Sequence, residues 1–209
     1  MLGCSDAKDP GRGRRGGHCC TAHHPVPNRN EKAAIWPGSK SWEVGFLGGS
    51  HDFMRDGVSL INSRTRFHFY ATGITPAMVK PPVGGGSQYV IGLRDAESNP
   101  LDGSKTYRIH IPPNVPARRF WEITVYDNQT RSFLQTDQPH PGVPSIDANA
   151  IQNADGSYDV YIGPKEPEGN VNWIQSIPGK GWNLLWRIYG PEQAWYDKKW
   201  RPGEIELVK

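Results

Sequence analysis

The clearest alternation of apolar and polar residues runs from Trp182 to Tyr189. Every second position in this run is apolar, and the positions between them are half apolar. A period of two residues predicts a β-strand, and two partly apolar faces predict a strand in the middle of a sheet. Trp173–Ile177 is also extended in character, and a Pro/Gly turn over residues 178–181 separates the two runs. The pattern therefore predicts a hairpin at the heart of a β domain.

Shorter alternating runs occupy most of the chain from Ser87 onward. Turn residues separate them, and the chain contains 24 glycines and 19 prolines. Several short strands broken by such turns are typical of a β-sandwich or a barrel. The segment Gln135–Ser145, with three prolines, is expected to be a surface loop. The alternating runs are residues 89–93, 107–111, 121–125, 158–162 and 205–207.

Residues 31–83 have a different pattern and are expected to form a linker region with one or two helices. Asp56 is a candidate N-cap, apolar residues then recur at helical spacing to Phe69, and Gly73 suits the position after a helix end. Thr75-Pro76 predicts a second, short helix with proline at its first position. Four aromatic residues among glycines are expected to anchor a loop in this region: Trp36, Trp42, Phe46 and Phe53.

Residues 1–30 have no hydrophobic period and are rich in Gly, Arg, His and Pro. This composition predicts a disordered basic tail, either part of the protein or not native to the fold. No apolar stretch follows Met1, so no signal peptide is expected. Cysteines and histidines cluster here, but their adjacent placement lacks the paired spacing of a structural zinc site, so no metal site is predicted. The cluster comprises Cys4, His18, Cys19, Cys20, His23 and His24.

The 209 residues are enough for one domain with a sizeable core and a short additional segment. The formal charge is +3, and residues 1–30 account for all of it, with five basic residues against two acidic ones. The rest of the chain is neutral overall, which argues against a nucleic-acid-binding surface. No apolar run is long enough to span a membrane. All three cysteines lie in the first 20 residues, so the body of the chain has no cysteine nucleophile.

Candidate chemistry is confined to one polar strand face, because the chain carries no familiar catalytic signature. If Thr106–Ile111 pairs with Trp121–Tyr126, residues of one parity face the core and residues of the other parity share the opposite face. In that register His110 lies opposite Glu122. A solvated sheet face shows the same alternation, so two interpretations remain open, a solvated face and a concave ligand face.

The ligand-face interpretation gives each polar residue a role. His110 and Glu122 form a polar pair, Arg108 contacts an anion, and Tyr126 offers a ring for stacking. Sandwich folds of the jelly-roll type bind sugars and small molecules on such faces. The predicted ligand-binding residues are Arg108, His110, Glu122, Tyr126, Gln129, Arg131, Arg187 and Tyr189; the catalytic residues are unknown, and no cofactor or metal is expected.

Tryptophans divide into two groups by their surroundings in the sequence. Strand parity places Trp121, Trp182 and Trp186 in the core. Trp195 and Trp200 lie among prolines and charged residues and are expected to be exposed.

Four stretches of the chain resemble a known family: FWEITVYDNQTRSFLQTDQ, NWIQSIPGKGW, RIYGP and WYDKKWRPGEIELVK. From about Pro27 to Lys209 the chain resembles domain of unknown function number 1214. The resemblance implies a jelly-roll β-sandwich preceded by a helical linker. It also implies a place in the C-terminal half of a larger, often exported protein. The usual partner in front of it, domain of unknown function number 1254, has no counterpart in this sequence.

These observations predict an antiparallel β-sandwich over residues 84–209. We expect it to bind a carbohydrate or another small molecule, or to be a structural module of a two-domain protein. The expected partners are a second copy of the chain or the missing N-terminal domain, without nucleic acid or a membrane span. The alternative is a hydrolytic or metal-dependent enzyme that uses His110 and Glu122.

Overall fold

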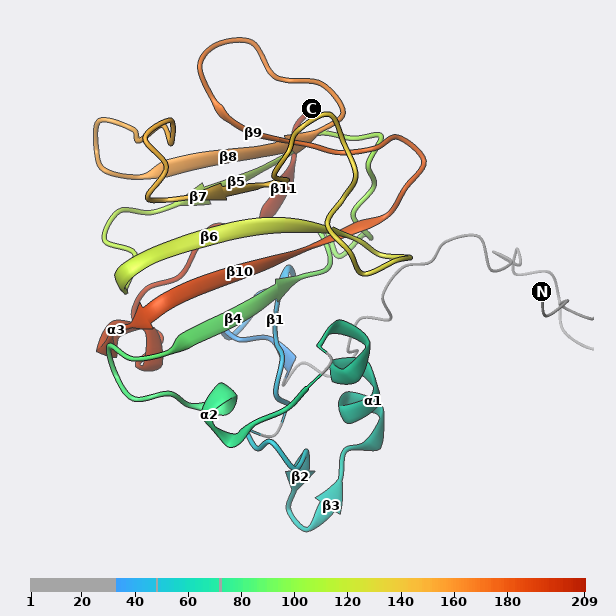
Figure 1. Cartoon of the computed structure of the whole chain (residues 1–209), viewed down its shortest axis with the longest axis vertical. Coiled ribbons are helices and arrows are strands. Elements are labelled where there is room, and N and C mark those ends of the chain that lie inside the picture. Colours follow the sequence, from blue (N-terminus) through green and yellow to red (C-terminus); the bar gives the residue numbers. More distant parts are fainter. Residues whose placement is uncertain (1–32, 48, 72) are drawn as a thin grey trace, which may run out of the picture.

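Two β-sheets pack face to face in this mainly β, largely antiparallel fold (Figure 1), a computed structural model that describes residues 33–47, 49–71 and 73–209. The predicted fold class is confirmed. The five-stranded sheet has the strand order β1 (Trp42–Val44), β4 (Ser87–Gly92), β10 (Trp182–Pro191), β6 (Ala117–Asp127) and β7 (Gly142–Pro144). The four-stranded sheet has the order β11 (Ile205–Leu207), β5 (Tyr107–Ile111), β8 (Tyr158–Gly163) and β9 (Asn172–Gln175).

The core lies between the two sheets and is rich in tryptophan. Trp186, in the middle of β10, is fully buried. Its ring centroid lies 5.7 Å from that of Trp42, 6.1 Å from that of Trp121 and 5.4 Å from that of Trp200. The apolar parity predicted for β5, β6 and β10 is the buried one throughout: Tyr107, Ile109, Ile111, Trp121, Ile123, Val125, Trp182, Leu184, Trp186 and Ile188.

The central position predicted for β10 is confirmed, because it pairs with β4 on one side and β6 on the other. The predicted hairpin between β9 and β10 is wrong. β9 belongs to the other sheet, where it runs parallel to β8. The turn between them crosses from one sheet to the other and is held by Gly103, whose N–H donates to the Lys180 carbonyl at 2.9 Å.

The predicted pairing of β5 with β6 is also wrong, because the two strands lie in different sheets. β5 pairs with β8 and β11, so His110 lies opposite Asp159 and not opposite Glu122. Glu122 lies opposite Arg187 instead. Parity alone identified the buried face correctly, since both strands present that face to the same core, but it could not identify the neighbouring strand.

The described part of residues 31–83 contributes to the sandwich as well as preceding it. Trp36, which lies in a bend, and Trp42, which begins β1, are both buried in the core. Phe53 and Phe67 are both buried, and the centroids of their rings lie 5.6 Å apart. The division into residues 31–83 and 84–209 stays a prediction.

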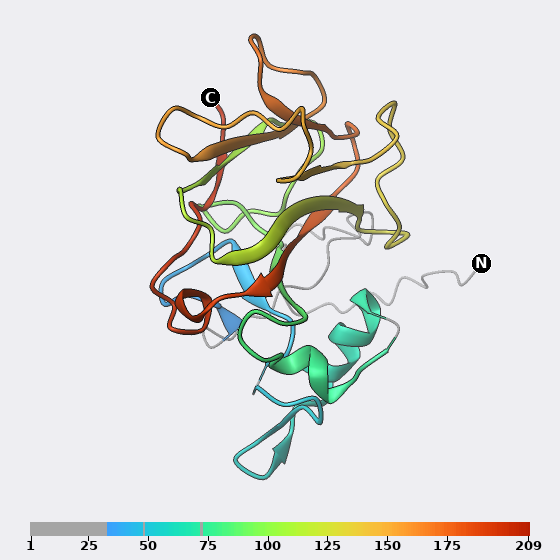
Figure 2. The same cartoon turned by 60° about the vertical axis from the view of Figure 1, so that its left-hand side comes forward.

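Helices and a small ribbon form the far end of the molecule, opposite the β8–β9 connection, in both views (Figures 1 and 2). Helix α1 (Ile61–Tyr70) begins later than predicted, because Asp56 occupies a left-handed turn (φ +50°) between β2 (Met54–Arg55) and β3 (Val58–Ser59). Helix α2 (Pro76–Val79) confirms the prediction of Thr75 as N-cap with proline at the first position.

Two predictions about the C-terminal half are corrected. Trp195, in α3 (Gln193–Tyr196), is buried against Trp36, and Trp200 is partly buried against Trp186. Both close one end of the core and are not surface residues. Gln135–Ser145 is mostly loop, but its last part forms β7 on the edge of the five-stranded sheet.

The two ends of the described chain are joined by hydrogen bonds. Trp42 Nε1 donates to the Gly203 carbonyl at 2.8 Å, and the Ser41 N–H donates to the Glu204 carboxylate at 2.8 Å. The Ile205 N–H donates to the Ser41 hydroxyl at 3.0 Å. The tail predicted over residues 1–30, with its Cys/His cluster, lies outside the described residues. None of the helices within the described ranges is long and apolar enough to span a bilayer.

Candidate functional site

The structure distributes the eight predicted site residues over three places. Arg108 and His110 lie on the outer face of the four-stranded sheet. Four others lie on the outer face of the five-stranded sheet, on the opposite side of the core. Gln129 and Arg131 lie in the loop after β6. The four on the five-stranded sheet are Glu122, Tyr126, Arg187 and Tyr189.

The polar groups on the five-stranded face satisfy one another. The Arg187 guanidinium donates to the Thr124 hydroxyl at 2.8 Å and also to the Tyr126 hydroxyl. His140, from the loop before β7, hydrogen-bonds the Glu122 carboxylate at 2.8 Å. Both terminal nitrogens of Arg187 therefore already donate to side chains of the same face.

Aromatic rings surround this polar network. The ring of Tyr189 stacks on that of Phe120, with centroids 4.1 Å apart. Burial is the main influence on the Tyr189 phenol and raises its pKa, against the opposing effect of Arg187. A phenol with a raised pKa stays neutral at ordinary pH, so it serves here as an apolar ring with a neutral hydroxyl.

The loop residues Gln129 and Arg131 are exposed, and no hollow found among the described residues includes them. The backbone N–H of Gln129 donates to the Asp127 carboxylate at 2.7 Å, so the backbone of Gln129 takes part in a turn. The Arg131 guanidinium lies 4.9 Å from the Phe69 ring centroid and 3.4 Å from the Phe69 carbonyl oxygen. Arg131 thus connects this loop to α1.

Asp159 is the centre of the polar group on the four-stranded face. One carboxylate oxygen accepts from Arg108 Nε and from His110 Nδ1, both at 3.0 Å. The other accepts from Asn153 Nδ2 at 3.0 Å. An ionised carboxylate only accepts hydrogen bonds, so the imidazole proton must be on Nδ1. Asp159 therefore fixes the tautomer of His110 and the direction of the Arg108 side chain.

Asp159 is ionised at neutral pH. Burial is the largest single influence and opposes its charge, but hydrogen bonds from His110, Asn153 and Arg108 together outweigh burial and lower the pKa of the carboxyl. The side chains of Arg108 and His110 are 41% and 39% exposed. In the described part of the chain, neither the terminal Arg108 nitrogens nor His110 Nε2 have a hydrogen-bond partner. Those groups are free to meet a ligand.

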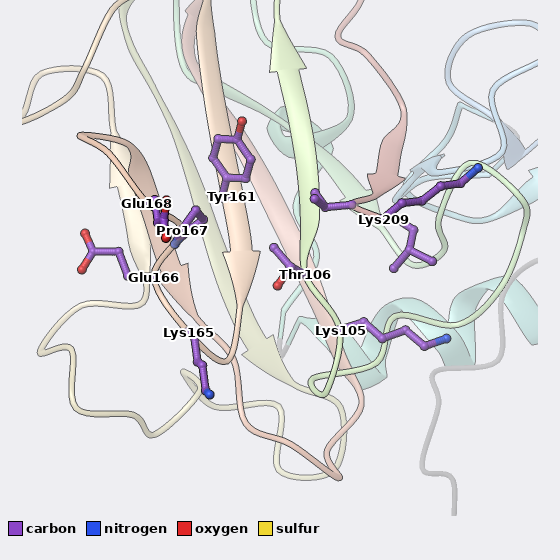
Figure 3. A pocket seen from close by; sticks show the side chains of 10 residues that line it. Lys105, Thr106, Tyr161, Lys165, Glu166, Pro167, Glu168 and Lys209 are labelled. Atoms are coloured by element: carbon purple, nitrogen blue, oxygen red, sulfur yellow. The ribbon is translucent and has the colours of Figure 1, made fainter.

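A hollow of about 620 Å³ opens beside this group on the same sheet (Figure 3). Tyr161 of β8, directly across from Arg108 on β5, lies on its floor next to Thr106. Figure 3 shows Glu166 and Glu168 on one side of the two and Lys105 and Lys209 on the other, with Lys165 on the side of the glutamates. The walls are formed by the segment just before β5, the β8–β9 connection and the C-terminal segment: Lys105, Lys165, Glu166, Pro167, Glu168, Leu207, Val208 and Lys209.

Asp159 and Tyr161 were missed by the sequence reasoning, although a signal for them exists. Val160 and Ile162 alternate with them in β8, so their parity already predicted an outward-facing pair. The sequence pattern does not indicate that β8 is the neighbour of β5. Asn153 lies in an irregular segment, where no sequence pattern indicates which way its side chain faces. No group of three or more His, Cys, Asp or Glu side chains suited to a metal occurs in residues 33–47, 49–71 and 73–209.

Solved structures similar to this chain include the following two. The VPA0106 protein from Vibrio parahaemolyticus aligns with a TM-score of 0.54 and 19% identity over 77% of this chain and 40% of that protein. An uncharacterised protein from Burkholderia cenocepacia aligns with a TM-score of 0.44 and 23% identity over 60% of this chain and 31% of that protein. The first likeness supports the fold alone. This chain spans less than half the length of either protein.

No curated protein matches this chain. Residues 86–193, which include β4, β5, β6, β8 and β10, match the family described as a protein of unknown function, DUF1214. The matched range is more than half of the chain and contains both candidate faces. The partner domain implied by the sequence resemblance is not part of the match. The chain therefore belongs to the DUF1214 family.

Proposed function

We propose that this domain binds a sugar acid on the outer face of the four-stranded sheet. The observation that carries the proposal is the position of Arg108. Its Nε is held by Asp159, its terminal nitrogens have no hydrogen-bond partner within the described residues, and Tyr161, opposite it on β8, lines the 620 Å³ hollow. A guanidinium fixed in this way presents two parallel donors, the arrangement that suits a carboxylate.

The hollow supplies the other contacts that a sugar ring needs. The Tyr161 ring and the exposed Leu207 and Val208 side chains form an apolar surface for the C–H face of a sugar. Glu166 and Glu168 can accept hydrogen bonds from hydroxyl groups. Glu206, opposite Arg108 on β11, adds a third acceptor.

The side chains that line the hollow carry a small net positive charge, three lysines against Glu166 and Glu168, which favours an acidic sugar over a neutral one. Lys105, Lys165 and Lys209 line it, and in the described structure none of them forms an ion pair. Exposed lysines attract an anion over a distance but hold it loosely. We therefore assign the directional contact to Arg108 and a supporting attraction to the lysines.

Calorimetric titration with a matched pair of ligands tests the proposal. Trigalacturonate should bind, and galactotriose, which lacks the carboxylates, should bind at least about tenfold more weakly, since a hydrogen bond to a charged group contributes roughly 1.5–3 kcal/mol. Arg108→Gln should weaken trigalacturonate binding by a similar factor. Arg187→Gln removes a guanidinium from the opposite face and is the matched control.

Each outcome has a distinct meaning. Loss of binding in Arg108→Gln but not in Arg187→Gln supports the four-stranded face. The reverse result would move the site to the face that holds Glu122, Tyr126 and Tyr189. No measurable binding of either sugar to the folded wild-type chain would overturn the proposal.

A second candidate function, contact with another protein domain, is favoured by the five-stranded face. Its polar groups are paired, while Phe69 and Phe133 beside them remain 39% and 44% exposed. The similar Vibrio protein is also much longer than this chain. Sedimentation of the purified chain, with Phe133→Ser as the variant, tests self-association through this face. A monomer at all concentrations would exclude a second copy as the partner.

A further inference from the structure

We infer that the Asp159–His110 pair gives this face an esterase activity toward acylated sugar acids. The inference rests on the proposed binding of a sugar acid at the same face. It uses a group that binding alone does not need, the free Nε2 of His110. The structure thus replaces the His110–Glu122 pair expected from the sequence with a pair whose geometry is suited to catalysis.

The imidazole is prepared to accept a proton. Nδ1 donates to the ionised Asp159 carboxylate at 3.0 Å, so in the neutral imidazole the lone pair is on Nε2. The side chain of His110 is 39% exposed, which leaves Nε2 accessible to water and to a substrate. A histidine oriented by a carboxylate in this way acts as a general base, and the carboxylate then stabilises the imidazolium that forms.

Arg108 supplies the second requirement, a group that stabilises negative charge. It lies two residues from His110 on the same outer face of β5, and both are bonded to the same oxygen of Asp159. The two side chains therefore meet at the Asp159 carboxylate, within one small region of the surface. Arg108 has five N–H donors, so one that binds neither Asp159 nor the substrate carboxylate would donate to an oxyanion formed there.

The hollow holds the rest of the substrate. Thr106, on its floor, lies four residues before His110 on β5, which is roughly 13 Å at the rise of a strand. Tyr161 lies between the two positions, across from Arg108. An oligosaccharide can thus rest in the hollow while an acyl group on one of its sugars reaches His110.

The reaction consumes one water molecule and needs no other reactant. His110 Nε2 takes a proton from the water as its oxygen forms a bond to the acyl carbon, and the resulting oxyanion is held by Arg108. The bond from the acyl carbon to the sugar oxygen then breaks. That oxygen takes the proton from the imidazolium, which yields a sugar hydroxyl and a carboxylic acid. Asp159 stays ionised throughout and is a positioning residue.

Release of acetate from acetylated trigalacturonate tests the inference. The wild-type chain should release acetate faster than buffer alone, and the rate should fall in acid, where a protonated imidazole cannot accept a proton. His110→Ala should reduce kcat by roughly 10²–10⁴-fold, the usual contribution of a general base. Asp159→Asn should lower kcat and also raise KM, because Asp159 holds Arg108 as well as His110. His140→Ala removes the equivalent histidine of the His140–Glu122 pair on the other face and should leave the rate unchanged.

Binding and turnover are measured separately, so the two proposals can fail independently. Binding of trigalacturonate without acetate release would overturn the esterase and leave the binding function standing. Acetate release that persists in His110→Ala would also overturn it. If Asp159→Asn does not fold, the pH profile of the wild-type chain and the comparison of His110→Ala with His140→Ala still decide the question.

Discussion

The indole of Trp42 lies 5.7 Å, centroid to centroid, from that of Trp186, although their strands are not neighbours in the sheet. β4 lies between β1 and β10, and the residue that separates the two tryptophans on the core side is Gly92, paired with Trp42 and Leu184. The missing side chain of Gly92 leaves room for Ile205 and Leu184, the residues that a Cβ at this position would meet first.

Replacement of Trp186 should show how much this contact contributes. Trp186→Ala removes a fully buried side chain from the centre of the core and should lower the free energy of unfolding by about 3–5 kcal/mol. Denaturant unfolding measures the change. Tyr189→Phe, on the outer face of the same strand, is the control and should change it by no more than about 0.5 kcal/mol. A loss below about 1 kcal/mol in Trp186→Ala would contradict the assignment of this face to the core.

Gly92 should not tolerate a methyl group. A Cβ at this position would lie 2.8 Å from Ile205 Cδ1 and 2.8 Å from Leu184 Cγ, which is closer than carbon atoms pack. Overpacking of this kind costs typically about 1–3 kcal/mol. Gly92→Ala should therefore lower the unfolding midpoint, whereas Gly73→Ala, with open space around its Cβ, should not lower it through a clash. Equal stability of the two variants would mean that the core shifts without cost.

Asp159 should make the fold sensitive to acid. The pKa of its carboxyl is lowered from the ordinary value of 3.8, by hydrogen bonds that outweigh its burial. A group with a lowered pKa in the folded state stabilises the fold above its unfolded-state pKa, and that contribution is lost as pH falls through the lower, folded-state pKa. The loss should begin below about pH 4.

Thermal unfolding as a function of pH measures this effect. Asp159→Asn should lose less stability than the wild type between neutral pH and pH values below about 4. Asp56→Asn, at an exposed turn where asparagine also suits a positive φ, should keep the wild-type dependence. A wild-type slope in Asp159→Asn would contradict the hydrogen bonding described for this carboxylate.

The ion pair of Arg66 and Glu43 should hold α1 against the five-stranded sheet. Arg66 Nη2 lies 2.6 Å from Glu43 Oε2, and the side chains are only 16% and 8% exposed. A double-mutant cycle with Arg66→Gln and Glu43→Gln should give a coupling of about 0.5–3 kcal/mol. The exposed pair His51–Asp52, at 3.3 Å, should give about 0–1 kcal/mol. If both couplings are near zero, α1 is held by its apolar contacts alone.

Strand parity predicted the buried residues of β5, β6 and β10 because a period of two is a local property of the backbone. The partner of each strand is not local. His110 could be assigned to an outward face from the sequence, but its neighbour was taken to be Glu122 when it is Asp159. A connection of a few residues can return to the same sheet or cross to the other one, and both choices bury the same side chains.

The prediction that Trp195 and Trp200 are exposed is wrong for a related reason. Trp195 and Trp200 lie among charged residues and prolines, a local context that is typical of a surface segment. Their burial comes from Trp36 and Trp186, which are remote in the sequence. Prediction of the candidate site was limited in the same way, because the partner of Arg108 and His110 is Asp159, which lies on another strand.

The hydrogen bonds that join Ser41 and Trp42 to Gly203, Glu204 and Ile205 have a consequence for the order of folding. These contacts link the beginning and the end of the described chain, so they close a very long loop and make folding slow relative to a protein with local contacts. During synthesis the β1 segment leaves the ribosome long before its C-terminal partners exist. Trp36 and Trp42 therefore stay exposed to solvent or to a chaperone until the last strand has been translated.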